Sequence, residues 1–484
     1  MNFRICAAAV ACLVTSACTV ESFDAMYDNI SGFPEYEESG DRFSEIKEND
    51  FMKTSDNNQS TFSIDADGAA YAYMRRNVRA GRLPDANSVR IEEYLNYFTF
   101  NYPDPESGQA VAINGEFGPC PWTPSHRLLR LGIKGRSLEE DNIPNSNYVF
   151  LVDVSGSMYS DDKLGLLKKG LISLVDNLRP DDRVSIVTYS GTVQRILGST
   201  PVSEAGSIKE AISKLTAGGS TAGGAAMKMA YEEAVANYIE GGNNRVVMGT
   251  DGDFNVGVTS TDELLEMAED YAAKGIYLTV CGFGTGNLND SMMETVSGKG
   301  NGTYEYIDCE EEMVKVFVNE VSKFHSIAND AKVQVTFDPE RVESYRLIGY
   351  ENRLLSNEDF ENDRKDAGEI GAGQTITALY EIIPGEAYED GGDAAVFDFR
   401  YKESPGASSI PLTLKIKPSS SISDEFNFAA GIAAYGLVLF DSKYKGAASF
   451  EMAYELSESG LGFDPYHYRE QFRSLVLAAR KITR

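Results

Sequence analysis

Strand and helix patterns alternate throughout residues 146–325, and this alternation constrains the fold more than any other feature of the chain. Short apolar runs rich in β-branched and aromatic residues, such as 148–152, alternate with longer amphipathic stretches, such as 163–178. Strands that alternate with helices in this way form a parallel sheet with helices on both faces. We therefore predict a doubly wound, mostly parallel α/β domain over residues 145–328, with ligands bound at the carboxyl ends of its strands.

Three loops at this predicted edge of the sheet carry oxygen-bearing side chains. The run 148–152 leads directly into Asp153-Val154-Ser155-Gly156-Ser157, and the strand over 245–250 is followed by Asp251. The glycine-rich loop 218–224 places Thr221 just before a helix. Carboxylate and hydroxyl oxygens gathered on tight turns suit a small hard cation such as Mg²⁺.

These loops together predict a divalent-cation site. The predicted metal ligands are Asp153, Ser155, Ser157, Thr221 and Asp251. Directly or through water, they supply all but one of the positions that an octahedral Mg²⁺ requires, and a partner's carboxylate is the natural ligand for the last. Mn²⁺ and Ca²⁺ are alternative occupants. Asp253 is close enough in sequence to contact one of the ligands from outside the coordination shell.

The segment 153–157, taken with Thr221 and Asp251-Gly252, resembles the metal-ion-dependent adhesion site of von Willebrand factor type A domains. Further segments look like a bacterial group of such proteins, the YfbK-like group. They are residues 60–65, 90–98, 120–122, 217–223, 250–257 and 346–353. The resemblance implies a Rossmann-like central domain, a metal site, and flanking N-terminal and C-terminal domains. It implies little about the partner.

The flanking sequence predicts three further regions and a linker. Residues 60–140 mix strand and helix patterns and predict a small N-terminal α+β domain. Residues 330–420 contain short strand patterns that predict a β-rich region, and residues 425–484 have helical periodicity. Residues 19–59 are acidic and polar, so we predict a mostly flexible tether whose scattered aromatic side chains dock locally on the folded part.

The N-terminus predicts export. Residues 1–18 contain Arg4, a short apolar run and small residues before Cys18, which is the pattern of a lipoprotein signal peptide lipidated at that cysteine. The apolar run is too short to span a bilayer. Lipidation at Cys12 and ordinary cleavage without lipidation are alternatives. We expect a lipid anchor in a bacterial membrane, the outer one in a Gram-negative cell, with the body in the periplasm or at the cell surface.

Charge and cysteine usage exclude several classes of function. The formal net charge is −30, which disfavours nucleic acid as a partner. The chain has three histidines, all far apart, so a histidine-based metal site or catalytic triad has little support. The body has Cys120, Cys281 and Cys309, whose spacing gives no disulfide framework. Cys281 and Cys309 could pair, but we favour buried free thiols.

Three other motifs are explained without a ligand-binding role. Residues 282–286 are glycine-rich but lack the pattern of a nucleotide-binding loop, so no nucleotide is expected. Lysines near the predicted metal site, Lys163 among them, are expected on the solvated face of a helix. For Asp65 and Asp67 we favour surface turn carboxylates over a second cation site.

The function that these features predict is divalent-cation-dependent protein binding, for adhesion or assembly, at the bacterial cell envelope. In this interpretation an Asp or Glu of an unidentified protein partner completes the metal site. An envelope scaffold whose metal site is structural is the alternative. A metal-dependent hydrolase is less favoured, because Ser155 stands where phosphotransferases of this kind place a second acid, and no base is evident nearby. We therefore expect no enzymatic activity.

Overall fold

The computed structural model describes residues 40–139, 143–219, 223–252, 260–365, 367–419 and 421–483. The predicted signal peptide with Cys18, and the metal-site candidates Thr221 and Asp253, lie outside the described residues. Within the described part of the chain, none of the helices combines the length and the apolar character needed to cross a bilayer.

The central domain is built on a six-stranded sheet with the strand order β10-β9-β8-β5-β6-β7. Its strands are β5 (Ser146–Asp153), β6 (Arg183–Tyr189), β7 (Val193–Pro201), β8 (Asn243–Thr250), β9 (Ile276–Phe283) and β10 (Tyr304–Ile307). All neighbouring pairs are parallel except β6 and β7. The predicted doubly wound sheet is confirmed. The edge strand β7 was not predicted, because none of its residues is buried and its apolar positions are few.

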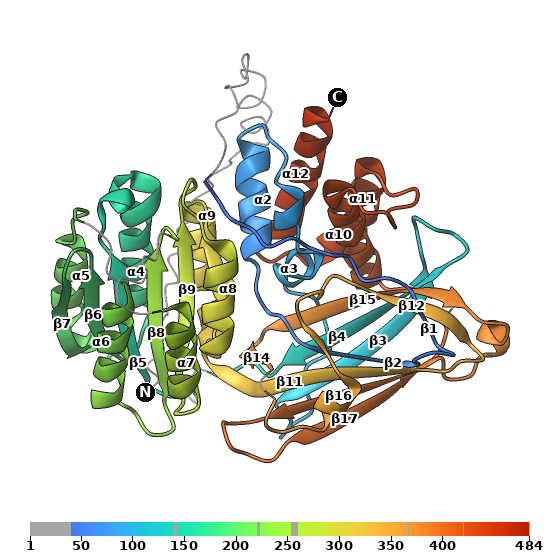
Figure 1. Cartoon of the computed structure of the whole chain (residues 1–484), viewed down its shortest axis with the longest axis horizontal. Coiled ribbons are helices and arrows are strands. Elements are labelled where there is room, and N and C mark those ends of the chain that lie inside the picture. Colours follow the sequence, from blue (N-terminus) through green and yellow to red (C-terminus); the bar gives the residue numbers. More distant parts are fainter. Residues whose placement is uncertain are drawn as a thin grey trace, which may run out of the picture. The chain divides into compact units, whose positions relative to one another are not determined.

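Helices cover both faces of this sheet (Figure 1). One layer contains α4 (Leu166–Asn177), α5 (Ala205–Ser213) and α9 (Glu310–Val314), and the other contains α6 (Gly223–Ala236), α7 (Thr261–Ala272) and α8 (Asp290–Lys299). Successive side chains of β5 pack alternately against the two layers of helices. Val149 and Leu151 pack under α6, whereas Phe150 and Val152 pack under α4. Burial on both faces explains the uninterrupted apolar run in the sequence.

The flanking strands form a β-sandwich that draws on both ends of the chain. One sheet has the order β1-β12-β15-β4-β3, and the other has the order β13-β2-β11-β16-β17, with β14 paired to β11. The strands from the N-terminal side are β1 (Met52–Lys53), β2 (Gln59–Ser63), β3 (Val111–Pro119) and β4 (Arg127–Gly135). Those from the C-terminal side are β11 (Ser326–Phe337), β12 (Val342–Ile348), β13 (Leu354–Leu355), β14 (Gly368–Gly371), β15 (Thr375–Pro384), β16 (Ala395–Lys402) and β17 (Ile410–Ile416).

This pairing differs from the expectation of separate regions over 60–140 and 330–420. Strand β4 pairs with β15, and β2 pairs with β11, so neither region forms its sheets alone. Side chains of both regions, such as Phe62, Leu131 and Phe397, share one apolar core. Each region taken alone has too few strands to cover its own apolar face, so the two combine. The central domain is therefore inserted between β4 and β11.

The helices of the two ends combine in the same way. Helices α2 (Ala69–Arg79) and α3 (Ile91–Asn96) share an aromatic core with α10 (Asp424–Phe440), α11 (Phe450–Ser457) and α12 (Tyr468–Ile482). Figure 1 shows the N-terminal helices in blue beside the C-terminal helices in red. In this core, Phe98 of the N-terminal side contacts Phe428 and Phe472, with ring centroids 5.1 Å and 5.7 Å away.

Residues 40–59 lie against the folded body, which differs from the predicted flexible tether. Strand β1 pairs with β12, Thr54 Oγ1 donates to Val342 O at 2.6 Å, and Arg42 N donates to Leu288 O at 2.8 Å. The aromatic ring of Phe43 packs on Tyr73, with centroids 4.9 Å apart. The aromatic contact agrees with the expected local docking, whereas the backbone pairing of this acidic segment was not expected.

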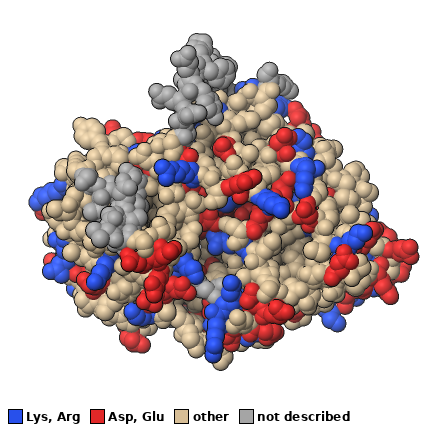
Figure 2. Space-filling view, in the orientation of Figure 1, with Lys and Arg blue, Asp and Glu red and all other residues tan. Residues whose placement is uncertain are grey.

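Charges are mixed over the face of the molecule shown in Figure 2. Among the coloured residues of that face, Asp and Glu side chains are interspersed with Lys and Arg. This face therefore presents no continuous basic surface of the kind that binds nucleic acid. The described thiols of Cys120, Cys281 and Cys309 are free, as favoured from the sequence, although Cys309 is only partly buried.

Candidate metal centre

Two of the predicted metal ligands lie at the ends of neighbouring parallel strands. Asp153 is the last residue of β5, and Asp251 directly follows β8, which pairs with β5. Both are buried, with 0% of Asp153 and 1% of Asp251 exposed. The strand register therefore brings two buried carboxylates to one edge of the sheet, an arrangement that is costly unless positive charge balances it.

The turn after β5 adds hydroxyl groups to this place. Ser155 N donates a hydrogen bond to Asp153 Oδ1 at 2.8 Å, and the hydroxyl oxygens of Ser155 and Ser157 lie 3.0 Å apart. The structure thus gathers a carboxylate and two hydroxyls on one tight turn. These are the hard oxygen ligands that Mg²⁺ prefers.

The glycine-rich loop is tied to the same turn by its backbone. Gly156 N donates to Gly219 O at 3.1 Å, and Gly218 N donates to Val154 O at 2.7 Å. Gly219 has a φ of 90°, a conformation that favours glycine. The chain just before Thr221 therefore lies beside the predicted metal ligands, while Thr221 itself is outside the described residues.

Lys163 contradicts the expectation that it lies on a solvated helix face. Its side chain is 11% exposed, and Nζ donates to Asp251 Oδ2 at 2.9 Å. Lys163 belongs to a short π-helical turn, Asp161–Gly165, and its stem passes against Gly284, where a Cβ atom would collide with it. The wider turn and the missing Cβ let the ammonium group reach the buried carboxylate. This glycine in the 282–286 motif thus makes room for a side chain.

Thr250 is a second contributor that was not predicted from the sequence. Its hydroxyl donates to Asp153 Oδ2 at 3.3 Å and accepts from Gly252 N at 3.2 Å. It therefore connects the end of β5 to the loop after β8. Its position directly before Asp251, at the end of a strand, is the only sequence signal that could have indicated this role.

Burial raises the pKa of Asp153 to about 6, and the charge of Asp251 adds to this rise. Hydrogen bonds from Ser155 and Thr250 act in the opposite direction. A carboxylate in such a place is easier to ionise when a cation is beside it. The donor set, with two buried carboxylates and a hydroxyl pair against one ammonium group, fits a hard divalent cation.

Asp65 and Asp67 contradict the expectation of surface turn carboxylates. They are 3% and 5% exposed. The segment between β2 and α2 is covered by the central domain, and Tyr304 N of β10 donates to Asp67 Oδ1 at 2.9 Å. Burial against another part of the chain was not visible in a local Asp-Ala-Asp-Gly pattern.

Family models match most of the chain. The model described as von Willebrand factor type A domain matches residues 147–320, and one described as von Willebrand factor matches residues 37–130. A model for the C-terminal part of the uncharacterized protein YfbK matches residues 322–482.

Relatives have similar sequences over long stretches. The uncharacterized protein YfbK of Escherichia coli K12 is 36% identical over 469 residues, which cover 91% of this chain and 81% of that protein. The uncharacterized protein sll0103 of Synechocystis is 28% identical over 194 residues, or 40% of this chain and 45% of that one. A solved structure, von Willebrand factor type A from Catenulispora acidiphila, has a TM-score of 0.43 at 17% identity and covers 73% of this chain and 88% of that one.

Proposed function

The chain belongs to the YfbK family and contains a von Willebrand factor type A domain, and from this premise we propose that it is a divalent-cation-dependent protein-binding protein of the bacterial cell envelope. The observation that supports this most directly is the pair of buried carboxylates, Asp153 and Asp251, beside the hydroxyls of Ser155 and Ser157. We propose that it acts by binding and not by catalysis.

The proposed metal ligands are Asp153, Ser155, Ser157, Thr221 and Asp251. Mg²⁺ would supply a doubly charged centre able to bind an external oxygen ligand. Asp153 and Asp251 would balance its charge, and the two serine hydroxyls would turn toward it. Lys163 shares Asp251 with the cation in this proposal, so the ion pair of these two residues weakens when the cation binds.

An exposed aromatic side chain beside these residues favours binding over a purely structural role for the metal. Tyr159 ends the short 3₁₀ helix Gly156–Tyr159 and is 85% exposed. Exposed tyrosines next to a specific polar contact are typical of protein interfaces. We propose that a partner's Asp or Glu binds the cation while Tyr159 contacts the surface around it.

We propose that the chain is exported and that Cys18 carries a lipid anchor. Mass spectrometry of the mature N-terminus tests this, with a diacylglyceryl cysteine at position 18 as the expected product. A mature N-terminus at another residue without lipid would refute the anchor and leave the metal-binding proposal standing.

The central experiment is a crosslinked pulldown from intact cell envelopes, with Mg²⁺ or with excess chelator. We expect a partner to be captured with Mg²⁺ and lost with chelator, and Asp153→Ala to capture none at normal solubility. Asp270→Ala, which changes an exposed aspartate on α7, is the matched control and should behave as wild type. Unchanged capture by Asp153→Ala would support the scaffold alternative, and a partner that stays bound in chelator would refute the proposal.

A further inference from the structure

A second group of carboxylates, with none of the residues proposed for the first centre, lies at the junction of the central domain with the flanking segments. Asp65 follows β2, Glu93 is on α3, and Glu294 is on α8. Each offers one oxygen atom, and these three oxygens lie within 4.8 Å of one another. Three segments that are distant in sequence therefore place carboxylate oxygens around one point.

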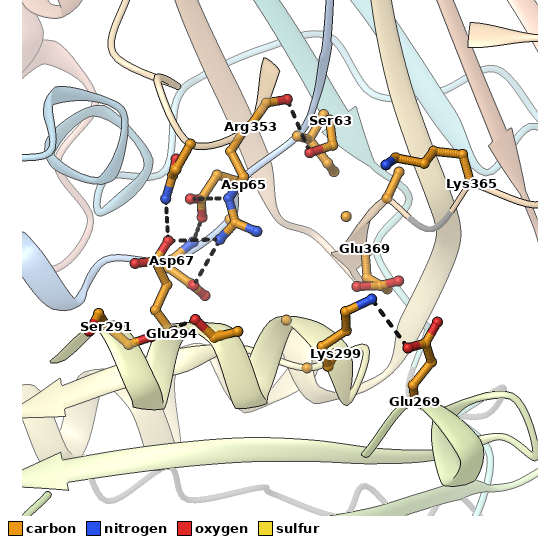
Figure 3. A pocket seen from close by; sticks show the side chains of 18 of the residues that line it. Ser63, Asp65, Asp67, Glu269, Ser291, Glu294, Lys299, Arg353, Lys365 and Glu369 are labelled. Atoms are coloured by element: carbon orange, nitrogen blue, oxygen red, sulfur yellow. Dashed lines mark hydrogen bonds and ion pairs between the residues drawn. The ribbon is translucent and has the colours of Figure 1, made fainter. Parts of the chain in front are cut away.

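Arginines bind part of this negative charge. Arg353 Nε donates to Asp65 Oδ2 at 3.0 Å, and its Nη2 lies 3.4 Å from Glu294 Oε1. A pocket of about 590 Å³ opens beside this group, and Figure 3 shows Asp65, Asp67 and Glu294 gathered around Arg353 at one side of it, away from Lys299 and Lys365. On the side of α3, Arg90 forms ion pairs with Glu93 and Asp290.

The carboxylates nevertheless outnumber the arginines. The acidic side chains are Asp65, Asp67, Glu92, Glu93, Asp290 and Glu294, and the arginines are Arg90 and Arg353. Except for Glu294 and Arg353, which are partly buried, all of them are buried. An excess of negative charge in a buried place is costly in the absence of a further cation.

Two buried polar atoms beside the group give independent evidence of a missing ligand. Glu92 is 1% exposed, and its Oε2 has no hydrogen-bond partner among the described residues. Glu92 lines a cavity of about 240 Å³ together with Asp290 and Glu294. The buried hydroxyl of Tyr304 also has no partner in the described structure, and Asp290, Arg90 and Glu93 are the charged groups that act on it most strongly. Buried polar atoms of this kind normally have a partner, so each of these two atoms is expected to have a ligand or a water beside it.

We propose that Asp65, Glu93 and Glu294 bind a second divalent cation, Ca²⁺, at this junction. Ca²⁺ binds oxygen atoms at about 2.3–2.6 Å, so one ion can contact oxygens that lie up to about 5 Å apart, whereas Mg²⁺ requires a tighter octahedron. The spacing within 4.8 Å therefore suits Ca²⁺. Ca²⁺ also accepts irregular sets of carboxylates and water. The bound ion would connect α8 of the central domain to the segments around β2 and α3.

The test measures Ca²⁺ binding to the full chain carrying Asp153→Ala, which disables the first centre. Equilibrium dialysis should find one tightly bound Ca²⁺ per chain, and added Ca²⁺ should raise the melting temperature. Adding Glu294→Gln, which keeps the size of the side chain, should weaken Ca²⁺ binding at least about ten-fold and abolish the thermal shift. Glu269→Gln, an exposed carboxylate that lines the pocket of Figure 3 and pairs with Lys299, is the matched control and should leave both unchanged.

Two results would overturn this second site. One is a folded Asp153→Ala protein that neither binds Ca²⁺ nor melts at a higher temperature in its presence. The other is Ca²⁺ binding that survives Glu294→Gln unchanged. Neither result depends on the first centre, because Asp153→Ala already disables that centre in the proteins tested. Failure of the metal-dependent pulldown would leave the second site unaffected.

Discussion

The ammonium group of Lys163 lies 2.9 Å from the buried carboxylate of Asp251, at the edge of the sheet where the proposed metal ligands gather. Without a divalent cation, this lysine still places a positive charge directly on Asp251. Because Asp251 is also a proposed metal ligand, the cation and Lys163 act on the same carboxylate. The lysine is therefore expected to set both the stability of the metal-free fold and the affinity for the metal.

Lys163→Met should destabilise the metal-free protein by about 3 kcal/mol, because it leaves Asp251 buried without its cationic partner. Saturating Mg²⁺ should recover most of this loss and should bind the variant more tightly than wild type. Urea unfolding with and without Mg²⁺ measures both effects. Lys169→Met removes an exposed lysine from α4, the helix that directly follows this turn, and is the control. An equal loss of stability with and without Mg²⁺ would contradict the shared role of Asp251.

Tyr159→Ala should weaken partner binding at least about ten-fold without changing Mg²⁺ affinity. The ring is 85% exposed, so its removal costs the fold little, whereas an interface would lose an aromatic contact. Quantitative pulldown and a metal titration measure the two properties separately. Tyr466→Ala, at a tyrosine that is 46% exposed in the C-terminal region, is the control. If Tyr159→Ala captures the partner as wild type does, this face is not the proposed interface.

The central sheet could be predicted because its strands have local signatures. Residues 148–152 are apolar on both faces, and the turn at Asp153 breaks the run abruptly. The positions of the oxygen-bearing loops within this alternation of strands and helices then indicated that the loops lie at one edge of the sheet. Strand β7 has no such signature, since an edge strand without buried residues lacks a regular alternation of apolar and polar positions.

Contacts between distant segments could not be predicted from local patterns. Nothing in the sequence near Leu131 indicates that it pairs with Ala378 in the next strand of its sheet. Likewise, Lys163 lies in a short π-helical turn, and so short a departure from α-helical geometry leaves no periodic pattern in the sequence. The carboxyl pair Asp65 and Asp67 resembled an ordinary turn, because the residues that bury it come from the central domain.

The shared helical core gives a prediction about cooperativity. Phe428→Ala should lower stability by about 3 kcal/mol, because the ring packs on Phe98 and beneath the guanidinium of Arg469, which lies 4.2 Å from its centroid. Hydrogen exchange should increase in α2 and α3 as well as in α10–α12, because these helices share one core. Val438→Ala, at a partly buried position on α10, should cost no more than about 1 kcal/mol. Faster exchange confined to α10–α12 would show that the two ends unfold independently.

His325 gives a prediction for acid pH. Burial, and then the charge of Arg245, lower the pKa of His325 to about 4. In the unfolded chain the imidazole binds a proton below about pH 6.5. Between about pH 4 and pH 6.5 the unfolded state therefore binds more protons than the folded state. The contribution to stability is therefore complete above about pH 6.5 and decreases as the pH falls toward 4.

His325→Gln should remove about 2 kcal/mol of the stability difference between about pH 7 and pH 4.5. Urea unfolding at both values measures this, with the exposed His467→Gln as control. An unchanged pH dependence in His325→Gln would show that His325 is protonated in the folded protein as readily as in the unfolded chain.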